Sequence, residues 1–493
     1  MPLDAVELPE PRLKKIPKPL QKLLSDDHYD RVSHSLGKAY RDVVRGFRGE
    51  FSNPPDLVAY PESPEDVDAI LSFCADERVA AIPFGGGTSV VGGVEPRMRE
   101  EYPGVVSIDL KRMDKVLEID AVSRAARIQA GATGPVLEDQ LRGDGFTLRH
   151  FPQSFEYSTL GGWIATRAGG HFATLYTHID DLVESVSAIT GTGDQWESRR
   201  LPGSGAGPSP DRMLLGSEGI LGVITEAWVR VQPRPEFKLS CGVAFDAFLE
   251  GAAAVRALSQ SGLNPANCRL LDALESETTG AGPPGKALLV LGFESPAVPV
   301  GAPMDEAIEI ARSHGGVPGE IRGKGPADSE AEESAVDRWR GAFLAAPYLR
   351  DGFVACGVLS DTFETAITWD KFESFHETVM DEATKKVEEV SGQARVSCRF
   401  THVYPDGPAP YFTVLAPAKR GGEVEQWDEI KAAASEAIID CGGTITHHHA
   451  VGRDHRPWYD RQRPEPFADA LRAAKAEVDP RGLLNPGVLI DPK

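Results

Sequence analysis

The sequence has few cysteines and no long hydrophobic run. Its six cysteines are scattered over 493 residues without a C-x-x-C pair, which argues against a disulfide framework and against a structural zinc site. No apolar stretch approaches the length of a membrane-spanning helix. Residues 1–24 are rich in Pro and Lys and lack an apolar signal-peptide core, so we expect a cytoplasmic protein.

Positive charge is also in short supply. Lys and Arg number 52 against 74 Asp and Glu, which gives a formal net charge of −22. Such a surface repels nucleic acid and anionic lipid over most of its area. We therefore expect no nucleic-acid partner, and any anionic ligand must be held by a local basic pocket.

The remaining composition is typical of a soluble globular protein. Hydrophobic residues make up 41% of the chain and charged residues 26%. A chain of this length is expected to divide into at least two domains. The prolines in Gln232–Pro235 predict a boundary between them.

The residue pattern predicts an α+β fold. A helix begins at Ser63, because this N-cap residue is followed by Pro64 and two acids. Before the boundary we expect strands at 56–61, 79–84, 105–110, 116–119 and 125–130, and a further helix at 134–141. Beyond it, helices at 245–258, 304–313, 371–390, 423–439 and 465–478 and strands at 287–293, 396–404 and 411–415 predict a sheet covered on one face.

One glycine-rich stretch, Val79–Gly93, has an apolar run that leads into three glycines, Thr88 and Ser89. It suits either a tight turn or a phosphate cradle, in which backbone N–H groups converge on an anion. It is not a Walker loop, because no Gly-Lys-Ser/Thr follows. Asp109 lies where a ribose-binding acid is expected, but glycines and prolines occupy 90–104, where a dinucleotide fingerprint requires a helix. A nicotinamide site is therefore disfavoured.

Two more glycine-rich segments follow, at 155–170 and 216–226. The first has small residues and hydroxyls on both sides of Trp163, and the second leads into the alternating strand that ends at Val231. One extended cofactor that passes several close backbone approaches explains three such segments in one half of a chain.

Taken together, 83–89, 155–170 and 217–225 resemble the flavin-binding domain of the vanillyl-alcohol oxidase and p-cresol methylhydroxylase superfamily. The resemblance implies a two-domain FAD-binding fold with an α+β cap domain built on an antiparallel sheet. It implies noncovalent FAD here, since Gly85–Ser89 contains no His that attaches flavin. The implied FAD contacts are Pro83, Phe84, Gly85, Gly86, Gly87, Thr88, Ser89, Gln153, Ser154, Phe155, Ser158, Thr159, Gly162, Thr166, Arg167, Ala168, Gly169, Glu218, Gly219, Gly222, Val223 and Ile224.

Further motifs resemble the alkyldihydroxyacetonephosphate synthases within this superfamily. They are Ser-Thr-Leu-Gly-Gly-Trp followed by Thr-Arg-Ala, Arg-Leu-Leu-Asp at 269–272, Thr-Phe-Glu-Thr with a nearby Trp-Asp at 362–370, Ser-Cys-Arg at 397–399, and three histidines followed by Val-Gly. The resemblance covers nearly the whole chain. It implies an enzyme of ether-lipid synthesis that exchanges the acyl group of acyl-dihydroxyacetone phosphate for a fatty alcohol, without net redox change, through an adduct at flavin N5.

The same resemblance assigns roles residue by residue. It implies Tyr411 as the general acid/base, Arg269 as an arginine required for activity, and His447, His448 and His449 as an active-site loop. For the substrate it implies contact with Arg350, while Thr362 stands where the animal enzymes carry a serine and Arg399 is a further candidate. A phosphate-bearing substrate favours arginine, because a guanidinium binds two oxygens at once.

Two other functions remain open. One is an FAD oxidase or dehydrogenase of a 2-hydroxy acid or alcohol. The dehydrogenases of hydroxy acids hold a metal with His-x-Gly-Asp-Gly-Asn-x-His, of which His402–Gly407 keeps one His and the Asp-Gly but lacks the second His. The other is a flavin-binding protein without catalysis. Three prolines at 405, 408 and 410 also depart from the animal synthases, which bears on the lipid substrate more than on the flavin.

The candidate residues also have plain structural interpretations. A tyrosine on a strand more often packs in a core, and a single arginine more often forms a surface salt bridge. On a strand, only His447 and His449 share a side, and no carboxylate cluster flanks them. We therefore expect no metal site, and we favour acid/base and anion-binding roles for the histidines.

The expected organisation is an N-terminal helical segment at 1–50, an FAD-binding domain at 51–234, a cap domain at 235–445, and a histidine loop and helix at 446–493 that return to the FAD domain. The expected partners are a phosphorylated, lipid-like small molecule and a second copy of the chain in a homodimer. Peripheral contact with a membrane stays open.

Overall fold

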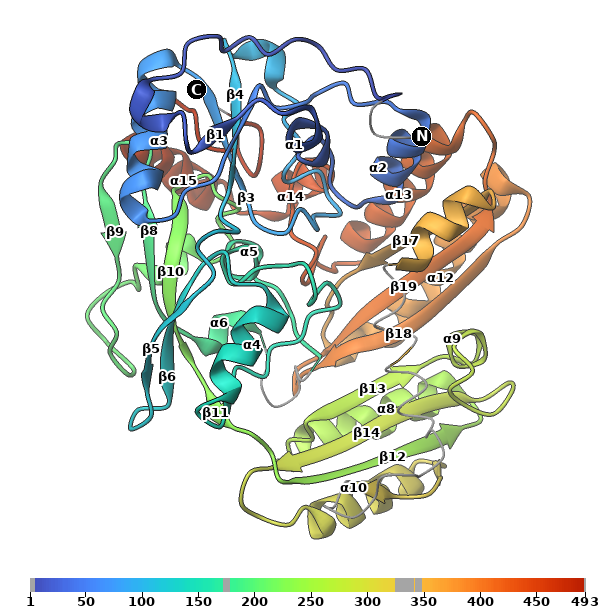
Figure 1. The fold of residues 1–493 in the computed structure, drawn as a ribbon. Helices are drawn as coiled ribbons and strands as arrows, with labels where there is room; N and C mark the ends of the chain where they lie inside the picture. Colours follow the sequence, from blue (N-terminus) through green and yellow to red (C-terminus); the bar gives the residue numbers. More distant parts are fainter. Residues whose placement is uncertain (1–4, 172–177, 324–340, 342–347, 492–493) are drawn as a thin grey trace.

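The computed structural model describes residues 5–171, 178–323, 341 and 348–491. Two regions, each built on its own β-structure, lie side by side in Figure 1, with the first half of the chain in blue to green and most of the second half in yellow to red. Each region has its own large hydrophobic core.

The first region contains two sheets. The smaller has the order β1-β2-β4-β3, in which β2, β4 and β3 are parallel, and the larger is antiparallel with the order β5-β6-β10-β8-β9. The strands are β1 Leu24–Ser25, β2 Leu57–Ala59, β3 Ala80–Phe84, β4 Val105–Asp109, β5 Val116–Asp120, β6 Ala125–Gln129, β8 Val183–Ile189, β9 Gln195–Glu197 and β10 Val223–Arg230; the short β7 Phe146–Thr147 pairs with β11 Gln232–Pro233.

The helices of this region are short apart from one. They are α1 His28–Ser33, α2 Tyr40–Arg48, α3 Pro64–Glu77, α4 Gly134–Arg142, α5 Leu160–Thr166, α6 Ile179–Leu182 and α7 Asp211–Leu214. The longest, α3, begins as the sequence predicts, because Ser63 Oγ accepts a hydrogen bond from the N–H of Asp66 at 3.2 Å. Its residues Val67, Ile70 and Leu71 are buried in the core.

The second region is an eight-stranded antiparallel sheet. Its order is β15-β12-β14-β13-β18-β19-β17, and β16 pairs with β12. The strands are β12 Phe237–Phe245, β13 Asn267–Leu271, β14 Ala287–Ser295, β15 Val317–Pro318, β16 Arg322–Gly323, β17 Val358–Glu364, β18 Arg395–Val403 and β19 Pro408–Pro417; the helices are α8 Phe248–Gln260, α9 Ala273–Thr278, α10 Gly301–Ser313, α12 Trp369–Ser391 and α13 Glu423–Asp440.

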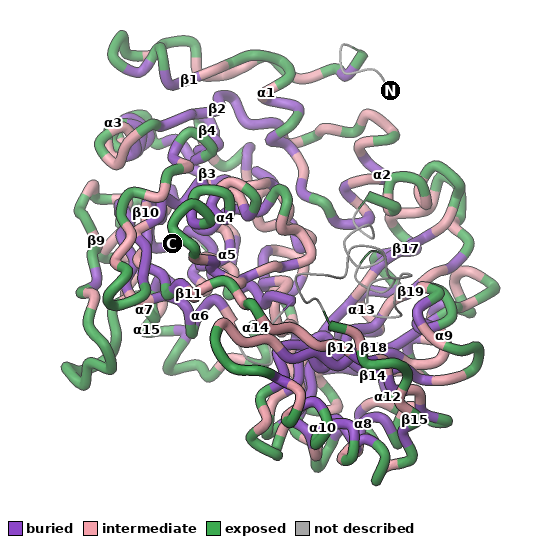
Figure 2. The backbone as a smooth tube through the Cα atoms, turned by 60° about the horizontal axis from the view of Figure 1, so that its bottom comes forward, coloured by how far each residue is buried: buried purple, intermediate pink, exposed green. Residues whose placement is uncertain are grey.

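One face of this sheet is covered by α8, α10, α12 and α13, as the sequence predicts. The central strands are nevertheless buried along almost their whole length, β18 from Val396 to Val403 (Figure 2). Helices on one face cannot bury both sides of a strand, since successive side chains point to opposite faces. The other face of the sheet therefore lies against the first region.

The end of the chain returns to the first region. After α14 Arg456–Gln462 and α15 Glu465–Val478, the N–H of Ala81 donates to the carbonyl of Leu483 at 2.8 Å, and the N–H of Asn485 donates to the carbonyl of Ala81 at 2.9 Å. Leu484 and Val488 are fully buried in the first core. The last residues thus pack beside β3, the strand that leads into the first glycine-rich stretch.

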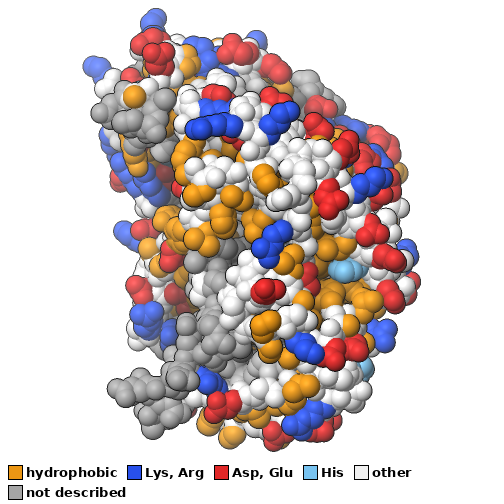
Figure 3. Space-filling model, turned by 90° about the vertical axis from the view of Figure 1, so that its right-hand side faces the viewer, with side chains coloured by type: hydrophobic (Ala, Val, Ile, Leu, Met, Phe, Trp, Pro, Cys, Tyr) orange, Lys and Arg blue, Asp and Glu red, His pale blue; other side chains and the backbone are white. Residues whose placement is uncertain are grey.

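The surface carries charges of both signs. Lys and Arg side chains are interspersed with Asp and Glu on the face in Figure 3, with apolar side chains between them. Among the helices of the described ranges, none has both the length and the apolar character needed to cross a membrane.

Candidate functional site

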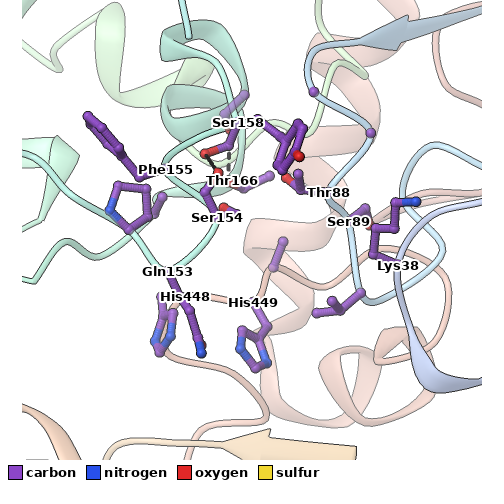
Figure 4. A pocket seen from close by; sticks show the side chains of 18 of the residues that line it. Lys38, Thr88, Ser89, Gln153, Ser154, Phe155, Ser158, Thr166, His448 and His449 are labelled. Carbon is purple, nitrogen blue, oxygen red and sulfur yellow. Dashed lines mark hydrogen bonds between the residues drawn. The ribbon is translucent and has the colours of Figure 1, made fainter. Parts of the chain in front are cut away.

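A cavity of ≈ 1150 Å³ lies between the two regions and is large enough for an extended cofactor together with a substrate. The three glycine-rich segments contribute to its lining, and strands β13, β17, β18 and β19 with part of the histidine loop complete it. Figure 4 shows Thr88 and Ser89, Ser154 and Ser158, and His448 and His449 around the same space. The structure brings together every residue proposed from the sequence except Arg167 and His447, which do not line the cavity.

The glycine-rich segments touch one another where they meet the cavity. A Cβ added at Gly86 would lie 1.8 Å from the carbonyl oxygen of Tyr157, and one added at Gly85 would lie 2.4 Å from Thr159 Oγ1. A Cβ added at Gly219, where φ is +79°, would lie 2.8 Å from Cγ of Pro83. These positions need glycine because a side chain would separate the segments.

The second segment is held in place by its own side chains. The indole N–H of Trp163 donates to Ser158 Oγ at 2.7 Å, and the hydroxyl of Thr166 donates to the carbonyl of Gly162 at 2.8 Å. Arg167 follows α5 with a left-handed backbone at φ 54°. Its side chain pairs with Asp180 at 2.7 Å, with 59% of it exposed, which explains why it lies outside the cavity.

The cap sheet presents polar side chains to the cavity at every second residue. Arg395, Ser397, Arg399 and Thr401 of β18 line it, while Phe400 packs on the helical side. Arg399 stands directly opposite Tyr411, and Tyr411 directly opposite Glu364, across β18, β19 and β17. Arg399 and Tyr411, two of the candidate groups, therefore form one row across the sheet with Glu364.

Tyr411 is buried in this row with only 4% of its surface exposed. The guanidinium carbon of Arg399 lies 3.9 Å from the centre of its ring, and Arg399 forms an ion pair with Glu275 of α9. Burial raises the pKa of Tyr411, and the positive charge of Arg399 opposes that rise. Because the net direction is upward, the phenol is protonated at neutral pH and can donate a hydrogen bond.

Two more arginines and Thr362 line the cavity. Arg269, 2% exposed, donates from Nη2 to the carbonyl of His171 at 2.9 Å. Burial lowers its pKa to about 9, and the nearby charge of Arg399 contributes to the shift. Arg350 lies in a helical turn at 348–355 and donates from Nη1 to the carbonyl of Lys38 at 2.5 Å. The acidic protein thus has a local basic pocket, as its charge requires.

The histidine loop is not a strand, so the predicted alternation of its side chains is wrong. Residues 447–449 form a bend wrapped around the carboxylate of Glu364, which accepts from the backbone N–H groups of His447 at 2.6 Å and His449 at 2.9 Å and from that of His448 at 3.2 Å. In this bend His448 and His449 face the cavity, whereas His447 turns towards Tyr404, with 2.9 Å between its Nε2 and the hydroxyl.

Sequence reasoning missed several groups that organise the site. Glu364 stands in the Thr-Phe-Glu-Thr motif but was assigned no role, and Glu275 was not singled out, because their partners lie more than 80 residues away. Glu218 was proposed as a cofactor contact; besides lining the cavity, it accepts from the N–H groups of Val451 at 2.9 Å and Gly452 at 2.8 Å. Burial raises its pKa to about 7. It therefore fixes the end of the histidine loop to the third glycine-rich segment.

Two family profiles match the chain. The profile described as FAD linked oxidases, C-terminal domain, matches residues 234–489, and that of an FAD binding domain matches residues 55–199. The second of these matches ends at residue 199, and the first begins at residue 234, inside the proline-rich segment at 232–235.

Characterised relatives cover almost all of the chain. An alkyldihydroxyacetonephosphate synthase of Dictyostelium discoideum is 31% identical over 95% of this chain and 78% of its own length. One from Trypanosoma brucei brucei is 30% identical over 98% of this chain and 83% of its own length.

Solved structures give the same picture. An alkyldihydroxyacetonephosphate synthase superposes with a TM-score of 0.82 and 28% identity over 99% of this chain and 87% of its own. A p-cresol methylhydroxylase with substrate bound gives a TM-score of 0.75 at 16% identity over 95% of this chain and 94% of its own, a likeness of fold alone. The two-domain FAD-binding fold is confirmed.

Proposed function

Since this chain belongs to the FAD-linked oxidases, and within them to the group of the alkyldihydroxyacetonephosphate synthases, we propose that it exchanges the acyl group of acyl-dihydroxyacetone phosphate for a fatty alcohol. The observation that supports this most directly is the row Arg399–Tyr411–Glu364 on the cavity face of the cap sheet. It sets a proton donor beside positive charge, which suits a ketone that carries a phosphate.

FAD is the cofactor of this flavoenzyme. The residues present fit it, because three glycine-bearing segments in mutual contact leave their backbones open to the cavity. Residues 83–89 would hold the pyrophosphate, and the other two segments would hold the remainder of the cofactor. When bound, FAD supplies an electrophilic ring system for the reaction.

In this proposal, Tyr411 moves a proton to and from the substrate beside its ketone. Its protonated phenol first donates a hydrogen bond, and the charge of Arg399 stabilises the phenolate that forms when the proton leaves. Arg269, Arg350 and His449 hold the phosphate, since they are cationic and hydrogen-bonding groups that line the same cavity.

Net oxidation of a 2-hydroxy acid or alcohol is the second candidate. His402, which lines the cavity close to Arg269, favours it, because an imidazole beside a cation suits a hydroxyl and carboxylate on neighbouring carbons. The two functions differ in what happens to electrons.

The assay that separates them supplies the purified flavoprotein with acyl-dihydroxyacetone phosphate and a fatty alcohol. Release of fatty acid with formation of the alkyl ether, and no net reduction of a dye, is the expected result. Substrate-dependent reduction of dye or oxygen by a hydroxy acid supports the second function instead. A protein that holds FAD and does neither rejects both.

The role of Tyr411 is tested by Tyr411→Phe. We expect turnover to fall by about 10²- to 10⁴-fold, the usual contribution of a positioned acid/base, with FAD still bound at full occupancy. Tyr459→Phe is the control, because Tyr459 packs against the first core outside the cavity. Near-normal turnover in Tyr411→Phe removes the tyrosine from the mechanism.

A further inference from the structure

Four histidines from separate parts of the chain meet beside the cavity. His402 lies near the end of β18, His447 and His448 come from the loop, and His178 precedes α6. The ring centres of His402 lie 4.6 Å from His447 and 5.1 Å from His448, and His178 lies 4.8 Å from His447. Such a cluster of imidazoles needs a chemical reason.

Among these four histidines, His402 stands out by its lack of hydrogen bonds to the part of the chain that the structure describes. It is 2% exposed, and neither ring nitrogen has a hydrogen-bond partner within the described ranges. Buried polar atoms in native proteins are almost always satisfied. Gly169 packs closely against the ring, because a Cβ there would lie 2.5 Å from its Nε2. The unpartnered ring nitrogens of His402 leave a lone pair open for a ligand.

The spacing of three of the rings suits a metal ion. One ligand atom from each of His402, His447 and His448 lies within 4.8 Å of the others, and the Nδ1 atoms of His447 and His448 are 3.0 Å apart. Nitrogens around a tetrahedral zinc ion are about 3.3 Å apart, from Zn–N bonds of about 2.0–2.1 Å. The pair from His447 and His448 is already close to this value, and binding of an ion would draw the three rings together.

Neighbouring groups hold these rings in place, as outer hydrogen-bond partners hold the histidines that bind metals. The Tyr404 hydroxyl lies 2.9 Å from Nε2 of His447, which leaves Nδ1 to face His448. Glu364 fixes the backbone of both loop histidines.

We propose that His402, His447 and His448 bind one divalent transition-metal ion of the zinc class, with its fourth position open to the cavity. Imidazole ligands select this class over Mg²⁺ and Ca²⁺, which prefer oxygen. His402 and His448 line the cavity, so an oxygen of the bound substrate can complete the coordination. Metal binding here does not depend on which reaction the enzyme catalyses.

The probe for this site is Zn²⁺ alone. Tag-free holoprotein is incubated with Zn²⁺, dialysed against metal-free buffer, and analysed for zinc and FAD by mass spectrometry and absorbance. We expect about one zinc per chain, bound by three protein ligands, and an anomalous scattering peak at the zinc edge between the three rings. His402→Asn and His448→Asn each lose the stoichiometric zinc and keep FAD.

Two further variants sharpen the test. His376→Asn is the matched control, and this variant protein keeps its zinc. His376 is also a mostly buried histidine without a partner for Nε2, but it lies on α12 away from the cluster. Tyr404→Phe weakens zinc binding by about 10- to 100-fold, as loss of an outer partner does. FAD content and the melting temperature report folding, and His448→Asn replaces His402→Asn if the latter does not fold. Wild-type protein that retains no more zinc than His448→Asn overturns the proposal, whatever its activity.

Discussion

The carboxylate of Glu364 accepts hydrogen bonds from four donors within one short segment. These are the hydroxyl of Thr446 at 2.6 Å and the backbone N–H groups of His447, His448 and His449. With 1% of its side chain exposed, Glu364 has no water to share these bonds. The position of every histidine in the loop therefore depends on this residue.

We predict that Glu364→Gln lowers kcat at least about 10-fold and destabilises the fold by about 1–3 kcal/mol, while FAD stays bound. The amide group of the substituted side chain presents two N–H donors to backbone N–H groups that are also donors. Buried donors are therefore left without an acceptor. Turnover, melting temperature and hydrogen exchange of the amides at 447–449 measure the effect. The control is Glu436→Gln on the exposed surface, where the ion pair with Arg461 contributes little. Unchanged exchange in Glu364→Gln contradicts the role.

At the scale of elements, the glycine-rich loop after β3 acts through contact with its neighbours. Gly86 sits against the carbonyl of Tyr157, where a Cβ would lie at 1.8 Å. Because backbone cannot move as a side-chain tip does, the two segments must separate to admit a methyl group. The loop therefore leaves room for FAD and also packs against the second glycine-rich segment.

Gly86→Ala should therefore release FAD and lower the melting temperature. We expect a loss of FAD affinity on the order of 100-fold, equivalent to about 2.7 kcal/mol, measured by titration of apoprotein and flavin fluorescence. Gly46→Ala is the matched control, because Gly46 lies inside α2 with nothing within 4 Å of an added Cβ. That variant should gain about 0.5–1 kcal/mol. Full FAD occupancy in Gly86→Ala argues against a cradle that needs glycine here.

At the scale of the whole molecule, the last residues of the chain join parts that are far apart in sequence. The side-chain amide of Asn485 donates to the carbonyls of Glu218 at 2.7 Å and Gly93 at 3.1 Å. It lines the cavity, and its backbone is left-handed at φ 38°. One buried side chain thus ties the first and third glycine-rich segments to the C-terminal segment.

We predict that Asn485→Ala destabilises the protein by about 1–3 kcal/mol and weakens FAD binding, since two buried carbonyls lose their donor. Asn264→Ala controls for backbone strain, because Asn264 is also left-handed at φ 49° but is exposed. Chemical denaturation and flavin titration compare the two. Equal losses of stability and FAD affinity in both variants mean that the left-handed backbone accounts for the effect, and not the hydrogen bonds of the Asn485 side chain.

Much of the local structure follows from the sequence. The Ser63 cap, the strands on either side of α3 and the helices covering the cap sheet are confirmed, because N-caps and apolar periodicity are local signals. The FAD-binding fold follows from three ordered glycine-rich motifs and is confirmed by the relatives. The domain limits, the site roles and the homodimer stay predictions.

Tertiary structure alone decided how the site is assembled. A sequence shows three adjacent histidines but not the carboxylate of Glu364 that bends them, since this bond joins residues more than 80 positions apart. It shows His402 but not the rings that gather around it. It shows Arg399 and Tyr411 but not that strand register places them face to face. Register, burial and long-range hydrogen bonds exist only in the folded chain. The sequence therefore determined the residue types and the fold. The packing of the two regions determined which chemistry those residues can carry out together.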